Sequence, residues 1–320
     1  MSMLTLRGLR WADVRLHRTA LLTGGGILLA ALAYTGWLRW AAHTYPQPRC
    51  YADAGCDTFL GFTSARDLLY ISMENGSLGL LLLPLLIGAF VAGPMVAREL
   101  ESGVYKVSWT QSVSPARWLA SKLTTAAACA VGATLFLMAV LKLGASQANG
   151  GRWQLNWADR GVYEATGPAL AAYGLLAVAV GAAVGLLVRR TLFAVSLTTA
   201  ITGAVILLMG QVRWHLFPAR AVSGASPDGD WWPASQPVDS FVMDQGVTNA
   251  AGDHFVAGQC LPTPEPGFSC PTDTRVTGWF MDYHPRSHFW YIQLIETGIV
   301  LALTAAAAYV AFRLLRRSVA

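Results

Sequence analysis

The segment PALAAYGLLAVAVGAAVGLLV at residues 168–188, followed by RRT at 189–191 and LFAVSLTTAITGAVILLMGQV at 192–212, decides the fold class. Neither apolar run contains a charged residue, and about 20 apolar helical residues cross a bilayer core about 30 Å thick. Because lipid offers the backbone no hydrogen-bond partners, both runs are predicted to be transmembrane helices joined by a tight hairpin. Gly181 and Gly185 would let another helix approach the first run closely.

Four further stretches share this character and extend it over the whole chain of 320 residues. They are Thr19–Ala42, Ser77–Ala97, Leu123–Leu143 and Phe289–Phe312. Only 13% of the residues are charged, against about 25% in soluble domains, and no ten-residue alternation typical of a β-barrel occurs. The composition therefore excludes a soluble protein, and we expect an all-α membrane protein with six transmembrane helices.

The first stretch also resembles a signal peptide, because four arginines precede it between residues 7 and 18 and Ala31-Leu32-Ala33 could serve as a cleavage site. The apolar run continues to Trp40, however, which is long for a signal peptide. We therefore predict a retained helix, preceded by a basic cytoplasmic segment over residues 1–18.

Positive charge is distributed unequally between the two sides of the predicted bundle. With six spans both termini share one side, which carries 13 Lys and Arg residues and three acids, while the opposite side carries ten and 14. Positively charged loops stay in the cytoplasm, so we expect both termini to be cytoplasmic. The basic excess then faces anionic lipid headgroups, and no nucleic-acid partner is needed to explain it.

The predicted loops divide the chain further. Residues 19–212 hold the first five helices and an inner loop at 98–121, and residues 289–320 hold the sixth helix and a basic tail. The loop 213–288 has 76 residues, with four tryptophans and eight acids. It is too long for a turn, so we predict a small extracellular subdomain.

Four of the five cysteines fall on the predicted outward side, which suits disulfides in an oxidising compartment: Cys50, Cys56, Cys260 and Cys270. Three connectivities are possible and sequence alone does not choose among them, although the short spacings favour one pair within each loop. Cys129, in the third helix, is predicted to be a small apolar packing residue.

Sequence motifs of common enzymes are missing. No G-x-x-x-x-G-K-[ST] phosphate-binding loop, H-E-x-x-H zinc motif or G-x-S-x-G nucleophile elbow occurs. His284 and His288 are four residues apart, but Pro285 between them argues against a shared helical face, so we expect no metal site. An enzyme with catalytic residues of its own is not supported.

The inner loop after the second helix carries the most informative sequence. Gly103 is predicted to end that helix, and Ser114 followed by Pro115 is a helix N-cap with proline at the first helical position. Between them, Val104–Ser112 is expected to form two short turns that display polar and aromatic side chains. These are Tyr105, Lys106, Trp109 and Gln111.

The loop has the pattern Arg98-Glu99-x-Glu101-x-Gly103, then Trp109-Thr110-Gln111-Ser112-Val113-Ser114, then Arg117 and Lys122. This pattern resembles that of the ABC-2 type ABC transporter permease family, in the branch common in high-GC bacteria. Ile295-Glu296-Thr297-Gly298 in the sixth helix agrees with the resemblance, as does the ratio of arginine to lysine, 20 to three. The resemblance extends over the whole chain.

The resemblance implies a six-helix ABC-2 fold of the type V exporter kind, with an N-terminal elbow segment, in a bacterial plasma membrane. It implies a dimer of this chain, or a pair with a paralogue, working with two separate ATPase subunits that bind ATP and Mg²⁺; no cofactor is expected in this chain. The inner loop would be the coupling helix that docks on the ATPase. The candidate contacts are Glu99, Glu101, Gly103, Tyr105, Lys106, Trp109 and Gln111.

Glu296 is the one acid deep within a predicted span. An acid in the membrane is costly and usually faces a bundle interior or a cavity. Glu296 could line a transport path, or it could be a hydrogen-bonded strut between helices. The sequence leaves both roles open.

The permease subunit of an ATP-driven exporter is the function that this sequence favours. Two other functions fit a chain with many spans: an immunity or sensor protein that sequesters a toxic peptide through its external loop, and an ion-coupled secondary transporter that uses Glu296. The latter normally has inverted repeats, which are not visible in this sequence. The sequence does not identify the substrate.

Overall fold

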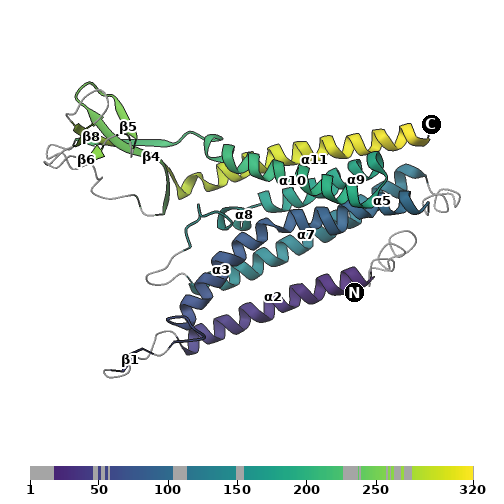
Figure 1. Cartoon of the computed structure of the whole chain (residues 1–320), viewed down its shortest axis with the longest axis horizontal. Helices are drawn as coiled ribbons and strands as arrows, with labels where there is room; N and C mark the ends of the chain where they lie inside the picture. Colours follow the sequence, from purple (N-terminus) through teal and green to yellow (C-terminus); the bar gives the residue numbers. More distant parts are fainter. Residues whose placement is uncertain are drawn as a thin grey trace. The chain divides into compact units, whose positions relative to one another are not determined.

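The computed structural model describes residues 18–45, 50–51, 55–56, 58–103, 114–148, 155–225, 237, 239–256, 259, 261–262, 268–269 and 276–319 (Figure 1). Its α-helices are α2 (Arg18–Thr44), α3 (Ala65–Leu81), α4 (Leu83–Ile87), α5 (Gly93–Ser102), α7 (Pro115–Ala148), α8 (Val162–Thr166), α9 (Ala169–Val188), α10 (Thr191–Val212) and α11 (Phe289–Val319). Shorter helical segments are the π-helix η1 (Gly88–Ala92) and the 3-10 helices η2 (Arg213–His215) and η3 (Arg286–His288). The strands are β1 (Cys50–Tyr51), β2 (Gly55–Cys56), β3 (Arg220–Ala225), β4 (Ser240–Asn249), β5 (His254–Val256), β6 (Leu261–Pro262), β7 (Phe268–Ser269) and β8 (Val276–Pro285).

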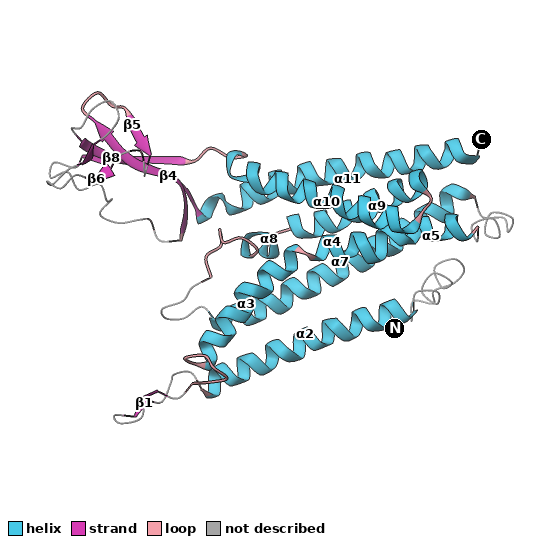
Figure 2. Cartoon of the chain, in the orientation of Figure 1, coloured by secondary structure: helices cyan, strands magenta, loops and turns pink. Residues whose placement is uncertain are grey.

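The chain divides into two compact units. The helical unit comprises Met1–Leu155, Asp159–Gly210 and Glu296–Ala320, and the sheet unit comprises Asn156–Ala158 and Gln211–Ile295. Figure 2 colours all helices cyan and all strands magenta, and the strands β3, β4, β5 and β8 belong to the second unit. Both α10 and α11 contribute residues to each unit.

Five helices in the described part of the chain are long and apolar enough to cross a membrane: Leu83–Ser102, Pro115–Ser146, Ala169–Val188, Thr191–His215 and Arg286–Arg317. The chain is therefore a multi-pass membrane protein. Each of the five overlaps one of the predicted stretches. The remaining stretch, Thr19–Ala42, lies in α2, a helix of 27 residues that is not among the five.

The second predicted stretch, Ser77–Ala97, is not one regular helix. Helical structure starts earlier, at Ala65, because the side chain of Ser64 accepts a hydrogen bond from a backbone N–H of the first turn at 3.2 Å. α3 is separated from α4 next to Pro84, and the π-helix η1 ends next to Pro94. Proline has no N–H to donate and clashes with the preceding turn, which explains why both irregularities occur beside a proline.

α9 forms the core of the helical unit and is buried along most of its length. A Cβ added at Gly181 would lie 2.5 Å from the Cβ of Ala92, and one added at Gly185 would lie 3.1 Å from the backbone nitrogen of Ala97. The predicted close approach at these glycines is confirmed, and the neighbouring segments are η1 and α5. The predicted hairpin is also confirmed, because α9 ends at Val188 and α10 begins three residues later.

Two of the four outward cysteines lie in described strands. β1 pairs with β2 in antiparallel fashion, and the register places Cys50 opposite Cys56. Cys260 and Cys270 lie outside the described residues. Cys129 is exposed on α7, so no neighbour within the described part of the chain encloses it, and its predicted packing role stays a prediction.

The sheet unit contains a four-stranded antiparallel sheet in the order β3-β8-β4-β5. The prediction of an all-α protein is therefore wrong for this part of the chain. The strands show little polar–apolar alternation because the register of β4 with β8 shifts between Val242 and Asp244, and because Gly246 occupies a packed position. A Cβ at Gly246 would collide with the carbonyl oxygen of Phe255 and lie 2.9 Å from the ring of Phe280, so glycine is required there.

Two buried histidines connect β8 with η3 in the sheet unit. The Nδ1 atoms of His284 and His288 are 3.0 Å apart, and His284 Nε2 lies 2.9 Å from the carbonyl oxygen of Trp214. A carbonyl only accepts, so Nε2 of His284 carries the proton and its Nδ1 accepts from His288. Burial lowers the pKa of His284; the bond to Trp214 opposes this shift, and the charge of His215 adds to it.

We expect the sheet unit to lose stability as the pH falls below about 6.5, the ordinary pKa of histidine, toward the lower folded-state pKa of His284. In that range the unfolded chain binds a proton at His284 and the folded chain does not, so acid favours unfolding. His288 faces this ring, and the charge of His215 acts on it in the direction that lowers its pKa. Protease cleavage within residues 211–295 of the full chain, compared at about pH 7.5 and 5.5, measures the effect.

The variant His284→Phe should show a weaker dependence on pH, because it cannot bind the proton. His254→Asn, at an exposed position of β5, is the matched control and should keep the wild-type dependence. An acid effect of the same size in His284→Phe would show that other groups cause it.

Candidate functional site

The loop that carries the predicted coupling residues is bounded as the sequence predicts. α5 ends at Ser102, and Gly103 has a φ of +75°, in the left-handed region that favours glycine. α7 begins at Pro115, and the backbone N–H of Arg117 donates to the side chain of Ser114 at 3.3 Å. Tyr105, Lys106, Trp109 and Gln111 lie outside the described residues.

Glu99 bridges the last turns of α5 and the first turns of α7. Its carboxylate accepts hydrogen bonds from Trp118 Nε1 at 3.1 Å and from Lys122 Nζ at 2.5 Å. The side chain of Lys122 is 3% exposed and that of Glu99 is 15% exposed, so the ion pair has little contact with solvent. The ammonium group also lies 5.5 Å from the centroid of the Trp118 ring, within range of a cation–π contact.

Apolar packing surrounds this ion pair. Trp118 is buried and belongs to a core cluster that includes Val96, Leu119, Leu186 and Leu315. In such surroundings an ammonium group is stable only beside its carboxylate, since a lone buried charge has a large desolvation cost. The pair therefore holds α5 and α7 in one relative position.

Glu101 lies two residues after Glu99, at an exposed position. Its Oε2 accepts hydrogen bonds from the backbone N–H of Thr191 at 2.9 Å and from the Thr191 hydroxyl at 2.5 Å. Thr191 is the first residue of α10, and the first N–H groups of a helix have no partner inside it. The carboxylate therefore caps α10 and faces the positive end of its dipole.

The sequence assigned Glu99 and Glu101 to contacts with another protein, whereas the structure gives both carboxylates partners within the chain. Spacing could not reveal these partners, because Lys122 is 23 residues from Glu99 and Thr191 is 90 residues from Glu101. One feature of the sequence did point to the contact of Glu101 with Thr191. Glu101 lies just before the helix-ending Gly103, on the same predicted side of the membrane as the 189–191 hairpin.

Glu296 is fully buried in the helical unit. Tyr163 of α8 donates its hydroxyl to Oε2 at 3.1 Å, and Tyr173 of α9 donates to Oε1 at 2.5 Å. The sequence did not identify these donors, although Tyr173 stands out as a hydroxyl-bearing residue within an apolar run. With two tyrosine donors, the carboxylate ties α11 to α8 and α9.

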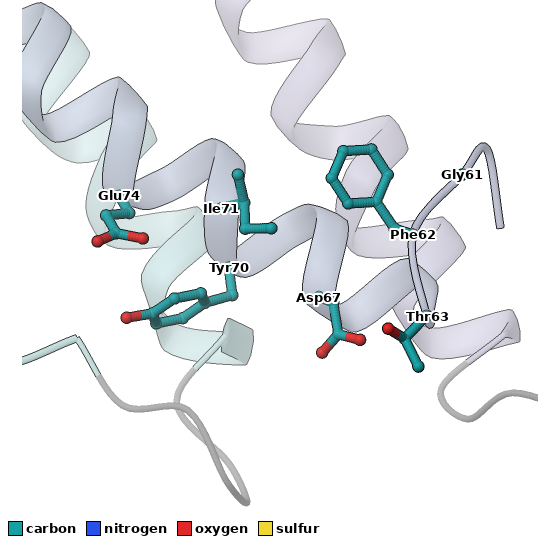
Figure 3. Close-up of a pocket in the computed structure, with 7 residues that line it drawn as sticks. All are labelled: Gly61, Phe62, Thr63, Asp67, Tyr70, Ile71 and Glu74. Atoms are coloured by element: carbon teal, nitrogen blue, oxygen red, sulfur yellow. The ribbon is translucent and has the colours of Figure 1, made fainter. Parts of the chain in front are cut away.

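A hollow of about 350 Å³ lies beside α3, and Figure 3 shows the side chains around it. Its lining residues are Gly61, Phe62, Thr63, Asp67, Tyr70, Ile71 and Glu74. Burial raises the pKa of Tyr70, and the negative charges of Glu74 and Asp159 add to the shift, so the phenol stays neutral. The combination of carboxylates with an aromatic ring suits a cation better than an anion.

The geometry described above is that of an integral membrane protein whose helices are tied together on either side of one inter-helix loop. Residues 22–213 match the model of a family described as ABC-2 membrane transporter related. The match covers more than half of the chain, and the chain belongs to this family. No curated protein and no solved structure matches the chain.

The variant Glu99→Ala is expected to lower the free energy of unfolding by about 3 kcal/mol, because it leaves the buried Lys122 ammonium unpaired. Removing both charges in Glu99→Ala/Lys122→Met should recover most of that loss, since an apolar side chain of similar length needs no partner. Unfolding of the purified chain in detergent measures both variants. Arg117→Ala is the control, because Arg117 is an exposed basic residue in the first turn of α7, and the variant should change stability by less than about 0.5 kcal/mol. A double variant as unstable as Glu99→Ala would contradict the pairing.

The variant Tyr173→Phe is expected to cost about 1–3 kcal/mol of stability, because it removes a donor from the buried carboxylate of Glu296. Tyr34→Phe is the matched control: its hydroxyl lies 3.2 Å from the Ser72 hydroxyl at an exposed position, and its loss should cost less than about 0.5 kcal/mol. Equal unfolding curves for the two variants would mean that the Glu296 contact is not a structural tie.

Proposed function

We propose that this chain is the permease subunit of an ATP-driven ABC exporter. The observation that carries the proposal is the family match over residues 22–213, because this range includes the inner loop at 98–121 and the helices on both sides of it. The five membrane-crossing helices support it. We take α2 as the sixth, since its 27 residues rise about 40 Å, and both termini are then cytoplasmic.

In this proposal the loop between α5 and α7 is the coupling helix. Tyr105, Lys106, Trp109 and Gln111 contact a separate ATPase subunit, and Gly103 turns the chain out of α5. Two ATPase copies bind ATP and Mg²⁺, and their closure moves the loop. The permease chain supplies no catalytic residue.

A second permease copy, or a paralogue, completes the exporter, and the substrate path lies between the two permeases. The burial of Glu296 beside two tyrosines supports a role as an inter-helix strut rather than as a lining residue of that path. The complex lies in a bacterial plasma membrane with the sheet unit outside. Disulfides join Cys50 to Cys56 and Cys260 to Cys270 there, and the first pair is supported by the register of β1 with β2.

Purification of the tagged full chain from its native membrane in mild detergent is expected to yield a stoichiometric soluble ATPase with it. The double variant Trp109→Ala/Gln111→Ala should bind the ATPase at least about tenfold more weakly, because truncation of one central interface side chain such as a tryptophan commonly costs about 2 kcal/mol. The control Arg317→Ala, in the C-terminal tail on the same predicted side, should retain the wild-type amount.

A wild-type chain that purifies without any ATPase would contradict the exporter. A peptide bound to the sheet unit would then favour the immunity or sensor function. Transport driven by a proton gradient without ATP would favour the secondary transporter.

A further inference from the structure

α10 is attached to the rest of the helical unit by polar contacts at one end. Within the described part of the chain, the two hydrogen bonds from α10 to another element both end at Glu101. The next residues, Leu192 and Phe193, are 82% and 62% exposed, and Ala194 is the one buried apolar residue of this first turn. The Glu101 carboxylate therefore supplies the polar attachment of the first turn.

The middle of α10 is packed but carries no further polar tie. The hydroxyls of Thr198 and Thr202 are fully buried and have no hydrogen-bond partner. Close to them, a Cβ added at Gly93 would lie 2.9 Å from the Cα of Val195, so α5 and α10 touch through backbone and small side chains. Apolar contact has no preferred direction, so it sets the position of α10 along its axis less specifically than a hydrogen bond does.

One end of α10 contacts the last turn of α5, and the other end continues into the sheet unit. Glu101 is two residues before Gly103, where α5 ends and the loop 104–113 begins. At its other end α10 continues into the sheet unit, which starts at Gln211. The helix has 22 residues and is about 33 Å long. One continuous helix thus runs from the Glu101 contact to the residue where the sheet unit begins.

We propose that Glu101 is a positioning residue that makes α10 follow the loop between α5 and α7, so that a movement of this loop reaches the sheet unit through α10. Glu99 has the complementary role, because its ion pair with Lys122 keeps the two helices that bound the loop together. The inference rests on the proposed function, in which an ATPase moves the loop. It assigns Glu101 to the interior of the permease and not to the ATPase surface.

The first experiment tests the contact in the isolated full chain by hydrogen–deuterium exchange. Glu101→Ala should speed exchange in the first turn of α10, at residues 191–194, by about tenfold, because a hydrogen bond to a charged acceptor is lost. Glu101→Gln keeps one acceptor oxygen and should have a smaller effect. Ser102→Ala is the matched control, since that hydroxyl bonds only to a carbonyl of its own helix, and it should change nothing at α10. Unchanged exchange in Glu101→Ala would overturn the proposal.

The second experiment tests the movement in the complex with its co-purified ATPase, using a non-hydrolysable ATP analogue with Mg²⁺ as the probe. In the wild type the analogue should change exchange in β4 and β8 of the sheet unit. In Glu101→Ala the ATPase should remain bound in the wild-type amount while this response is lost.

Three results of this second experiment would also overturn the inference. Loss of the ATPase from Glu101→Ala would make Glu101 a contact with the partner. A response that persists in Glu101→Ala, or that is absent from the wild type, would show that α10 does not transmit the movement. Failure of the proposed function is recognised separately, because then no ATPase accompanies the wild-type chain, although the exchange at α10 still reports on the Glu101 contact.

Discussion

The pairing of the buried Lys122 ammonium with the Glu99 carboxylate is the constraint on which one end of the helical unit depends. Leu119 and Leu315 pack in the same region, where water is excluded and a charge is stable only beside its partner. α5 and α7 must therefore keep the relative position that brings these two groups within hydrogen-bond distance. As a consequence, the two helix ends that bound the loop keep a constant position relative to each other.

Carboxylates also determine which of the other helices are joined by directed polar contacts. Glu296 brings together α8, α9 and α11 through two tyrosine hydroxyls, and Glu101 holds the first residue of α10. Hydrogen bonds have a direction and a short range, so they determine which helices move together. Thr198 and Thr202 show the opposite case, because their hydroxyls add polarity to α10 without tying it to a neighbour.

Much of the helical unit is predictable because it follows from local chemistry. The apolar runs, the helix ended by Gly103, the N-cap at Ser114 and the close approach at Gly181 each depend on residues within a few positions of one another. The sheet of the second unit was missed for the converse reason. Its register shifts, and Gly246 leaves a gap in the alternation that only the neighbouring strand explains.

The sequence by itself determined three properties: that this is a multi-pass membrane protein, where the helices on both sides of the inner loop end, and which family the chain resembles. These properties depend on residue type and short spacing. The tertiary structure alone decided what the acids do. A carboxylate selects its partner by distance in space, and the partners of Glu99, Glu101 and Glu296 are 23, 90 and 133 residues away along the chain. No local pattern contains that information, because only the packing of the helices brings the groups together.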